Sequence, residues 1–280
     1  MKSFLLKYVI IPRLRKTYPF LTRVLNSLHH CRFPLKLNRR FFLSKHLLSG
    51  QTILQFDPSD HLTVKWVCEH LIEKLQTENV IPLVIDIGAN DGFLSSNSYN
   101  VIRMGWNAVL IEPYDKNYRT LIKLLAAVKI FKTQIVISKM LGIGKTDGQK
   151  YLTTNIPGDV CDMEGKVEDK PSKDSVSVEL STLKTLFSKD PACHHLIRES
   201  KFIMLSIDVE GKEREVINQF LANGIYADII IIETFRLDEN EFNHFMKDHQ
   251  YKNANVIHWN TIYIKDDKRP PQSFMTGALF

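Results

Sequence analysis

The stretch Val84-Ile85-Asp86-Ile87-Gly88-Ala89-Asn90-Asp91-Gly92 decides the fold of this 280-residue chain. It continues a nearly all-apolar run, residues 81–87, of the kind that forms a strand covered on both faces of a sheet. A glycine-bearing turn follows the run directly, and we expect a helix after it. Because ligands in open α/β sheets bind at the carboxyl ends of strands, the stretch predicts a ligand site at this turn.

The residues of the turn restrict the kind of ligand. Gly88 lets the backbone approach a ligand closely, because a Cβ there would collide with it, and Gly92 permits tight helix–strand contact. Asp86 ends the strand with its carboxylate near the same crevice. Asn90 stands where the dinucleotide fingerprint G-x-G-x-x-G has its second glycine, and Asp91 repels a diphosphate. The turn therefore favours a ligand with a positive centre, such as S-adenosylmethionine, although a tight turn without a ligand explains the same residues.

A second strand end carries an acid. The apolar run 108–111 stops at Glu112-Pro113, about 20 residues after the turn. An acidic residue at this place can accept hydrogen bonds from both hydroxyls of a ribose. Glu112 is therefore a candidate ligand-binding residue, and a solvated charge at the end of a strand is the alternative.

Further apolar runs alternate with helical patterns. The runs are 134–137, 202–207 and 227–232, and helices are predicted at 59–78, 117–128, 212–222 and 239–248. This alternation predicts a parallel sheet with right-handed crossovers. Two runs on either side of Asn260 predict a closing antiparallel hairpin, and the polar residues 145–175 predict a hairpin plus loop.

A pair of acids ends the strand predicted at 202–207. Alternation along an extended chain places Asp208 and Glu210 on the same side. Two such carboxylates repel each other, so one can keep a raised pKa and serve as a proton acceptor near neutral pH. Helix capping and backbone binding are the structural alternatives. With Glu233 the pair offers oxygen ligands suited to Mg²⁺, but no spacing demands a metal and none is assigned.

With these residues the chain resembles the FkbM family of class I S-adenosylmethionine-dependent methyltransferases. The matching pieces are 84–92 (VIDIGANDG), 110–113 (LIEP) and 205–215 (LSIDVEGKERE), within a resemblance that covers about residues 80–265. It implies a Rossmann-like class I methyltransferase sheet, mostly parallel with a C-terminal antiparallel hairpin. It also implies S-adenosyl-L-methionine as cofactor, held by Asp86, Gly88, Asn90, Gly92 and Glu112, with Ser138 in the segment where adenine contacts are expected.

The resemblance implies an enzyme that transfers a methyl group, by analogy to the oxygen of a small-molecule or glycan-like acceptor. Asp208 and Glu210 are the candidate catalytic residues, and His258 and Trp259 are candidates to border the acceptor. The alternatives are a non-catalytic member that acts in binding or assembly, a nicotinamide-dependent oxidoreductase and a nucleic-acid methyltransferase. Missing phosphate-loop glycines disfavour the oxidoreductase, and a missing N-P-P-Y-like motif disfavours action on nucleic acid.

The charge of the chain is concentrated in its N-terminal segment. Residues 1–56 contain 11 Lys and Arg and no acid, so the remainder holds 26 (37 − 11) basic and 31 acidic residues. A uniformly basic nucleic-acid binder is therefore a poor fit. This composition suits three interpretations: a transit peptide, a basic helix on an anionic membrane surface, or an additional helical subdomain packed on the core. We divide the chain into this extension (1–58), a methyltransferase domain (59–265) and a tail (266–280), and we expect an intracellular protein of the cytoplasm or mitochondria.

Overall fold

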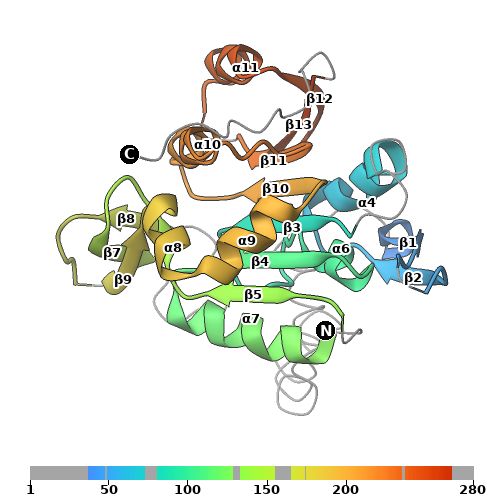
Figure 1. Cartoon of the computed structure of the whole chain (residues 1–280), viewed down its shortest axis with the longest axis horizontal. Helices are drawn as coiled ribbons and strands as arrows, with labels where there is room; N and C mark the ends of the chain where they lie inside the picture. Colours follow the sequence, from blue (N-terminus) through green and yellow to red (C-terminus); the bar gives the residue numbers. More distant parts are fainter. Residues whose placement is uncertain are drawn as a thin grey trace, which may run out of the picture.

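A seven-stranded sheet forms the centre of the molecule (Figure 1). The computed structural model describes residues 37–47, 49–72, 81–128, 133–154, 165–173, 175–234 and 237–266. The strands in chain order are β3 (Leu83–Ile87), β4 (Asn107–Ile111), β5 (Val136–Lys139), β10 (Ile203–Ile207), β11 (Ile229–Glu233), β12 (Tyr251–Ile257) and β13 (Asn260–Lys265). Their order in space is β12-β13-β11-β10-β3-β4-β5.

The pairing of these strands confirms the predicted sheet. Strands β5, β4, β3, β10 and β11 are parallel, and β13 and β12 close the sheet as an antiparallel hairpin. The chain runs outward from β3 through β4 and β5 on one side and then through β10 and β11 on the other, so the strand order reverses between β3 and β10. In α/β sheets this reversal is the place where ligands bind.

Helices cover both faces of the sheet. One face packs on α8 (Leu183–Lys189), α9 (Pro191–Glu199), α10 (Glu213–Ala222) and α11 (Glu239–Asp248). The other face packs on α4 (Thr63–Val67), η4 (Cys68–Ile72), α6 (Tyr99–Arg103) and α7 (Asp115–Val128). Strand β3 alternates between the two layers, with Ile85 in the first and Val84 in the second. Burial on both faces explains why the strands read as continuous apolar runs.

The segment after the glycine turn differs from the prediction, because no helix begins at Gly92. Helix α6 begins at Tyr99, and the residues before it are irregular. The Oδ1 atom of Asp91 accepts hydrogen bonds from the backbone N–H groups of Phe93 (2.9 Å) and Leu94 (2.8 Å). A side chain that binds nearby backbone in this way offers the chain an alternative to a helix.

His194 and His195 lie in helix α9. The helix begins with Pro191 in its first turn, and the Asp190 carboxylate accepts a hydrogen bond from the N–H of Cys193 (2.9 Å). Both features are ordinary signals of a helix start.

A second, smaller sheet is inserted between β5 and α8. It consists of β6 (Gly142–Ile143), β7 (Gly148–Thr154), β8 (Gly165–Glu168) and β9 (Ser175–Ser181), in the order β6-β9-β7-β8. Its β7–β8 pair contains the hairpin predicted within residues 145–175. In Figure 1 this sheet lies on the left, at the end where α7 begins, which is the carboxyl end of β4.

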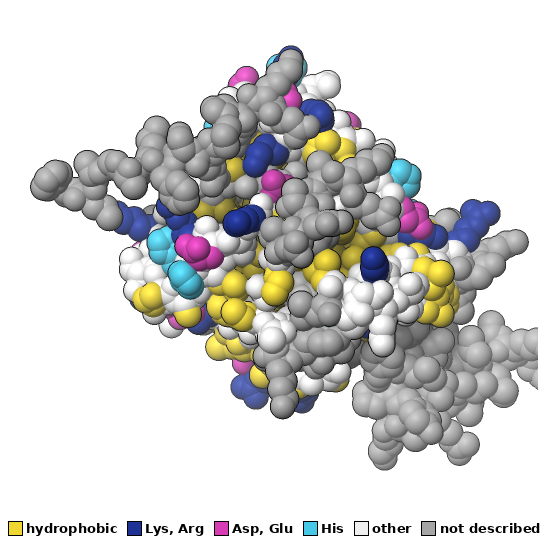
Figure 2. All heavy atoms as spheres, turned by 45° about the vertical axis from the view of Figure 1, so that its right-hand side comes forward, with side chains coloured by type: hydrophobic (Ala, Val, Ile, Leu, Met, Phe, Trp, Pro, Cys, Tyr) yellow, Lys and Arg dark blue, Asp and Glu magenta, His cyan; other side chains and the backbone are white. Residues whose placement is uncertain are grey.

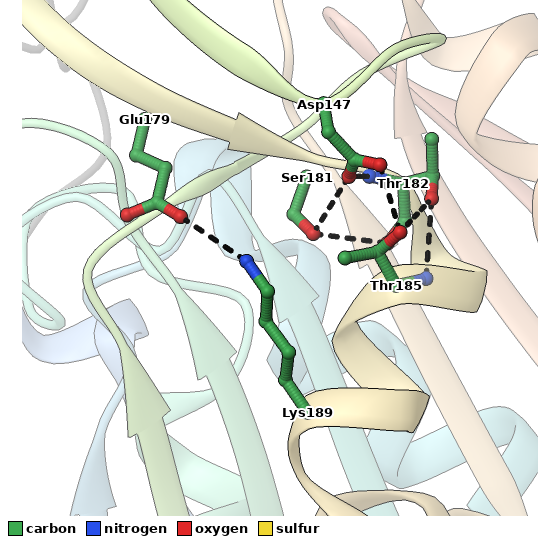
Figure 3. A network of polar contacts seen from close by, with 6 residues as sticks. All are labelled: Asp147, Glu179, Ser181, Thr182, Thr185 and Lys189. Atoms are coloured by element: carbon green, nitrogen blue, oxygen red, sulfur yellow. Dashed lines mark hydrogen bonds and ion pairs between the residues drawn. The ribbon is translucent and has the colours of Figure 1, made fainter.

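One carboxylate ties the second sheet to helix α8 (Figure 3). Asp147 accepts hydrogen bonds from the N–H of Thr182 (2.8 Å), the hydroxyl of Thr185 (2.8 Å) and the hydroxyl of Ser181 (3.2 Å). These hydrogen bonds, led by the one from Thr182, lower the pKa of Asp147. The ionised side chain therefore joins the start of β7 to the end of β9 and to the first turn of α8.

The described part of the N-terminal extension is a hairpin. After η2 (Leu37–Arg40), β1 (Phe41–Lys45) pairs with β2 (Thr52–Phe56), and the side chain of Phe42 is buried. Residues 1–36 and 267–280 lie outside the described residues, and with them lie the targeting, membrane-contact and tail predictions. Among the residues that are described, no helix is long and apolar enough to cross a membrane.

Candidate functional site

A cavity of about 790 Å³ opens at the carboxyl ends of β3, β4 and β10. Its volume falls within the roughly 300–1,000 Å³ usual for small-molecule sites. The second sheet forms the facing wall through residues of β6, β7, β8 and β9. Five of the residues predicted from the sequence line this cavity: Gly88, Asn90, Glu112, Asp208 and Glu210.

Gly88 is required for a different reason from the one expected. Its φ is +88°, a conformation that favours glycine, and a Cβ built on it would lie 1.9 Å from the carbonyl oxygen of Asp208. The close approach is therefore between two backbone segments, the turn after β3 and the turn after β10. The N–H of Asp208 also donates to the carbonyl of Ile87 (3.0 Å), which fixes the two turns together.

Glu112 is buried and bound to the backbone on both sides. Its Oε2 accepts a hydrogen bond from the N–H of Asn90 (2.8 Å), and its Oε1 accepts one from the N–H of Tyr114 (2.8 Å). Burial raises the pKa of Glu112 to about 7, against the effect of these two donors. Each carboxylate oxygen has a second lone pair, so the side chain can accept further hydrogen bonds from a ligand in the cavity.

Three predicted residues do not line the main cavity. Asp86 is buried in β3, and its Oδ2 accepts a hydrogen bond from the Ser98 hydroxyl (2.6 Å). It borders a small separate void of about 20 Å³ beside Gly88. A Cβ on Gly92 would lie 2.4 Å from the Leu121 side chain, so this glycine serves the packing of α7. The hydroxyl of Ser138 faces that of Tyr118 on the same helix (3.2 Å).

In the chain that follows β5, Gly142, Ile143 and Gly144 line the cavity, whereas Ser138 does not. A Cβ on Gly142 or Gly144 would lie 2.7 or 2.8 Å from the side chain of Leu180 on β9, which explains both glycines. The Gly144 carbonyl accepts a hydrogen bond from the Gln219 amide on α10 (3.0 Å). The two closely spaced glycines were the signal for this wall, and the sequence did not say which element they would contact.

Carboxylates gather where β10 and β11 end. Oxygens of Asp208, Glu210 and Glu233 lie within 4.8 Å of one another. Burial raises the pKa of Asp208 well above its usual range, and the neighbouring Glu233 raises it further. Glu210 has a left-handed backbone, with φ at +55°. These oxygens have the chemistry to hold a divalent cation or to share a proton.

Two histidines lie near these acids, and the sequence had singled out His258 but not His61. The ring of His61 stacks on that of His258, with centroids 3.7 Å apart, and both residues have positive φ. Asp60 accepts a hydrogen bond from the Ser95 hydroxyl (3.0 Å), and its charge raises the pKa of Asp208. Ser59 and Asp60 had been interpreted as the cap of a helix over 59–78, whereas a left-handed turn at His61 and Leu62 interrupts that helix.

The strand order, the closing hairpin and the cavity at the reversal of strand order define a Rossmann-like class I methyltransferase fold. A sequence model described as the methyltransferase FkbM domain matches residues 86–256. The match covers more than half of the chain, and the chain belongs to this family. No curated protein matches the chain.

Several solved methyltransferases have a similar shape at low sequence identity. The methyltransferase FkbM from Methylobacillus flagellatus KT is 14% identical, with a TM-score of 0.43 over 70% of this chain and 46% of that chain. The human methyltransferase 10 domain containing protein is 11% identical, with a TM-score of 0.42 over 88% of this chain and 96% of that chain. A SAM-dependent methyltransferase from Agrobacterium tumefaciens is 8% identical, with a TM-score of 0.42 over 85% and 73%. This chain spans less than half of the first structure, and the family assignment rests on the sequence match.

Proposed function

We propose that the protein is an S-adenosylmethionine-dependent methyltransferase that acts on a hydroxyl group of a small-molecule or glycan acceptor. The observation that carries this proposal is a single cavity with Glu112 at one strand end and Asp208 at another. Glu112 suits a ribose, and the carboxyl of Asp208 suits an acceptor that must lose a proton. Family membership supports the methyl transfer, and the following steps support the finer assignments.

The residues at the ends of β3 and β4 fit the cofactor. The carboxylate of Glu112 faces the cavity, and its two backbone donors fix its orientation. Gly88 and Asn90 line the same cavity, which is wide enough for a nucleoside. When bound, the cofactor supplies a methyl group on a positively charged sulfur. Glu112 and Asp208 in this lining can complement that charge.

The pair Asp208–Glu233 is suited to accept the proton of a hydroxyl group. The raised pKa of Asp208 makes its deprotonated form a stronger base than an ordinary carboxylate. A neutral hydroxyl is the acceptor that benefits from such a base, since a carboxylate acceptor has no proton to lose.

Aromatic rings lie near these acids, at residues that do not themselves line the cavity. His61 and His258 are stacked, and Trp259 is 41% exposed beside His258. Flat rings pack against the apolar faces of sugars and other cyclic alcohols. These residues favour a cyclic polyol or glycan over a flexible chain.

Binding and turnover are tested separately. Calorimetry of the full chain with S-adenosylmethionine should give a dissociation constant in the micromolar range, about −8 kcal/mol, and NAD should not bind. Binding of NAD alone would overturn the proposal. Incubation of a cell extract with the protein and a methyl-labelled cofactor should then label a hydroxyl-bearing small molecule or glycan. Cofactor binding without label in any fraction would indicate a binding or assembly protein instead.

A further inference from the structure

The β1–β2 hairpin exposes apolar side chains on its outward face, although its inner face also carries the buried Phe42. The register pairs Leu43 with Leu54, so both point to the outward face, and they are 67% and 60% exposed. Phe41 on this face is 41% exposed, and its ring contacts that of Phe56 at 5.4 Å. The solvent-facing side of such a hairpin is usually polar. Figure 2 brings this side of the molecule forward and shows hydrophobic side chains exposed on it.

The inner face is held by a buried polar network. The Gln55 amide donates to the Ser44 hydroxyl (2.6 Å), and the Asn100 amide of α6 donates to the Gln55 side-chain oxygen (2.9 Å). The buried Arg40 donates to the carbonyl of Asp57 (2.7 Å) at the open end of the hairpin. The hairpin is thus firmly attached to α6, and its apolar face cannot turn inward without breaking these bonds.

Two exposed basic side chains lie on or next to this face. Lys45 lies on the outward face, Arg39 precedes the hairpin, and both are exposed. The 36 residues that join the hairpin at Leu37 contain eight Lys and Arg and no acid, interspersed with apolar residues such as those of Tyr8–Ile11. Basic and apolar residues in combination are what an anionic membrane surface attracts.

We propose that the outward face of the β1–β2 hairpin docks the protein on an anionic membrane surface. A second copy of the chain is a poorer occupant. Two five-residue strands offer about 17 Å by 10 Å, or roughly 170 Å² per partner. A stable protein interface buries more than about 1,000 Å² in total.

The location of the hairpin suits this role. In Figure 1, β1 and β2 lie on the right of the molecule, while the second sheet that walls the cavity lies on the left. A protein docked through the hairpin keeps its cavity facing away from the hairpin side. Docking is therefore compatible with entry of ligands.

Flotation of the full chain with lipid vesicles tests this inference without reference to methyl transfer. The protein should bind vesicles with about 30% phosphatidylserine at least tenfold better than pure phosphatidylcholine, and salt raised from about 0.1 M to about 0.5 M should weaken binding. The double variant Leu43→Ser/Leu54→Ser should bind about tenfold less, because two largely exposed leucines lose their apolar contact. The control Val256→Ser removes another exposed apolar side chain, 44% exposed on β12, and should bind as the wild type.

A labelling experiment separates the membrane from other occupants. With Leu43→Cys, maleimide labelling of this cysteine, followed by peptide mass spectrometry, should be fast in solution and slowed by the anionic vesicles. Slow labelling in solution would mean that the chain itself or a second copy covers the face, and would overturn the inference. Equal vesicle binding by the double variant and the wild type, with unchanged unfolding temperatures, would overturn it as well.

Discussion

The α-carbon of Gly88 and the carbonyl oxygen of Asp208 approach so closely that a Cβ on Gly88 would lie 1.9 Å from that oxygen. This contact joins the turn that ends β3 to the turn that ends β10, across the reversal of strand order. The glycine of the most recognisable motif therefore sets the position of the candidate catalytic carboxylate.

Substitution of Gly88 should destabilise the fold. We expect Gly88→Ala to lower the free energy of unfolding by more than about 3 kcal/mol, since the strained φ adds to a collision with backbone that cannot move aside. Gly211→Ala is the matched control, because Gly211 has a similar φ of +94° and open space around it. Thermal or urea unfolding of both variants measures the difference. Equal losses of unfolding free energy in the two variants would show that the backbone at Asp208 can move away from the added Cβ.

Glu112 should determine the affinity for the cofactor. We expect Glu112→Ala to weaken S-adenosylmethionine binding by about 1–3 kcal/mol, since the ligand loses a charged acceptor and the N–H groups of Asn90 and Tyr114 lose theirs. Asp115→Asn removes an exposed carboxylate three residues away and should leave the affinity unchanged. Calorimetry checks both. An unaltered dissociation constant in Glu112→Ala would remove this residue from the site.

The same side chain should make folding stability depend on pH. The folded-state pKa of Glu112 is about 7, above the ordinary value of 4.5, so its charged form is disfavoured in the folded protein. Its contribution is fully present below pH 4.5 and is lost as pH rises through about 7, which amounts to about 3 kcal/mol. Between these two pH values, the free energy of unfolding of Glu112→Gln should change by about 3 kcal/mol less than that of the wild type. Glu199→Gln, an exposed carboxylate on α9, serves as the control and should match the wild type.

Asp208 should affect turnover far more than binding. With an acceptor identified by labelling, we expect Asp208→Asn to lower turnover by about 10²–10⁴-fold at nearly constant cofactor affinity. A loss of affinity to the same degree would assign Asp208 to cofactor binding instead.

The pH profile of turnover should identify the role of Glu233. Activity requires the deprotonated base, so it should fall as pH decreases through the raised pKa of the pair. In Glu233→Gln the neighbouring charge that raises the pKa of Asp208 is gone, and the acid limb should move to lower pH. An acid limb at the wild-type position would show that another group accepts the proton.

The sheet could be predicted from the sequence because burial on both faces leaves a continuous apolar run. Helices α7, α10 and α11 were also expected, within two residues of their observed starts. The prediction failed where local hydrogen bonds override pattern, as at Asp91, and where helices are short. In α8, Leu183, Leu186 and Phe187 follow helical spacing behind the cap Thr182, but seven residues give too little periodicity to stand out.

The candidate site was predictable only in part. Residues next to the strand ends, such as Glu112 and Asp208, follow from the topology, since parallel strands bring their carboxyl ends together. The direction of a side chain does not follow in the same way, and Ser138 and Gly92 face α7. The pair His61–His258 joins positions 197 residues apart through two left-handed turns. No periodicity in a single sequence encodes such a pair.

The second sheet could be exchanged as a single piece of chain. One continuous piece of chain, from Gly142 to Ser181, forms one side of the cavity. Asp147 near its start accepts hydrogen bonds from Ser181 and Thr182 at its end. An exchange of the chain between Gly142 and Ser181 would reshape that wall of the cavity, while the strand ends that carry Glu112 and Asp208 would stay as they are.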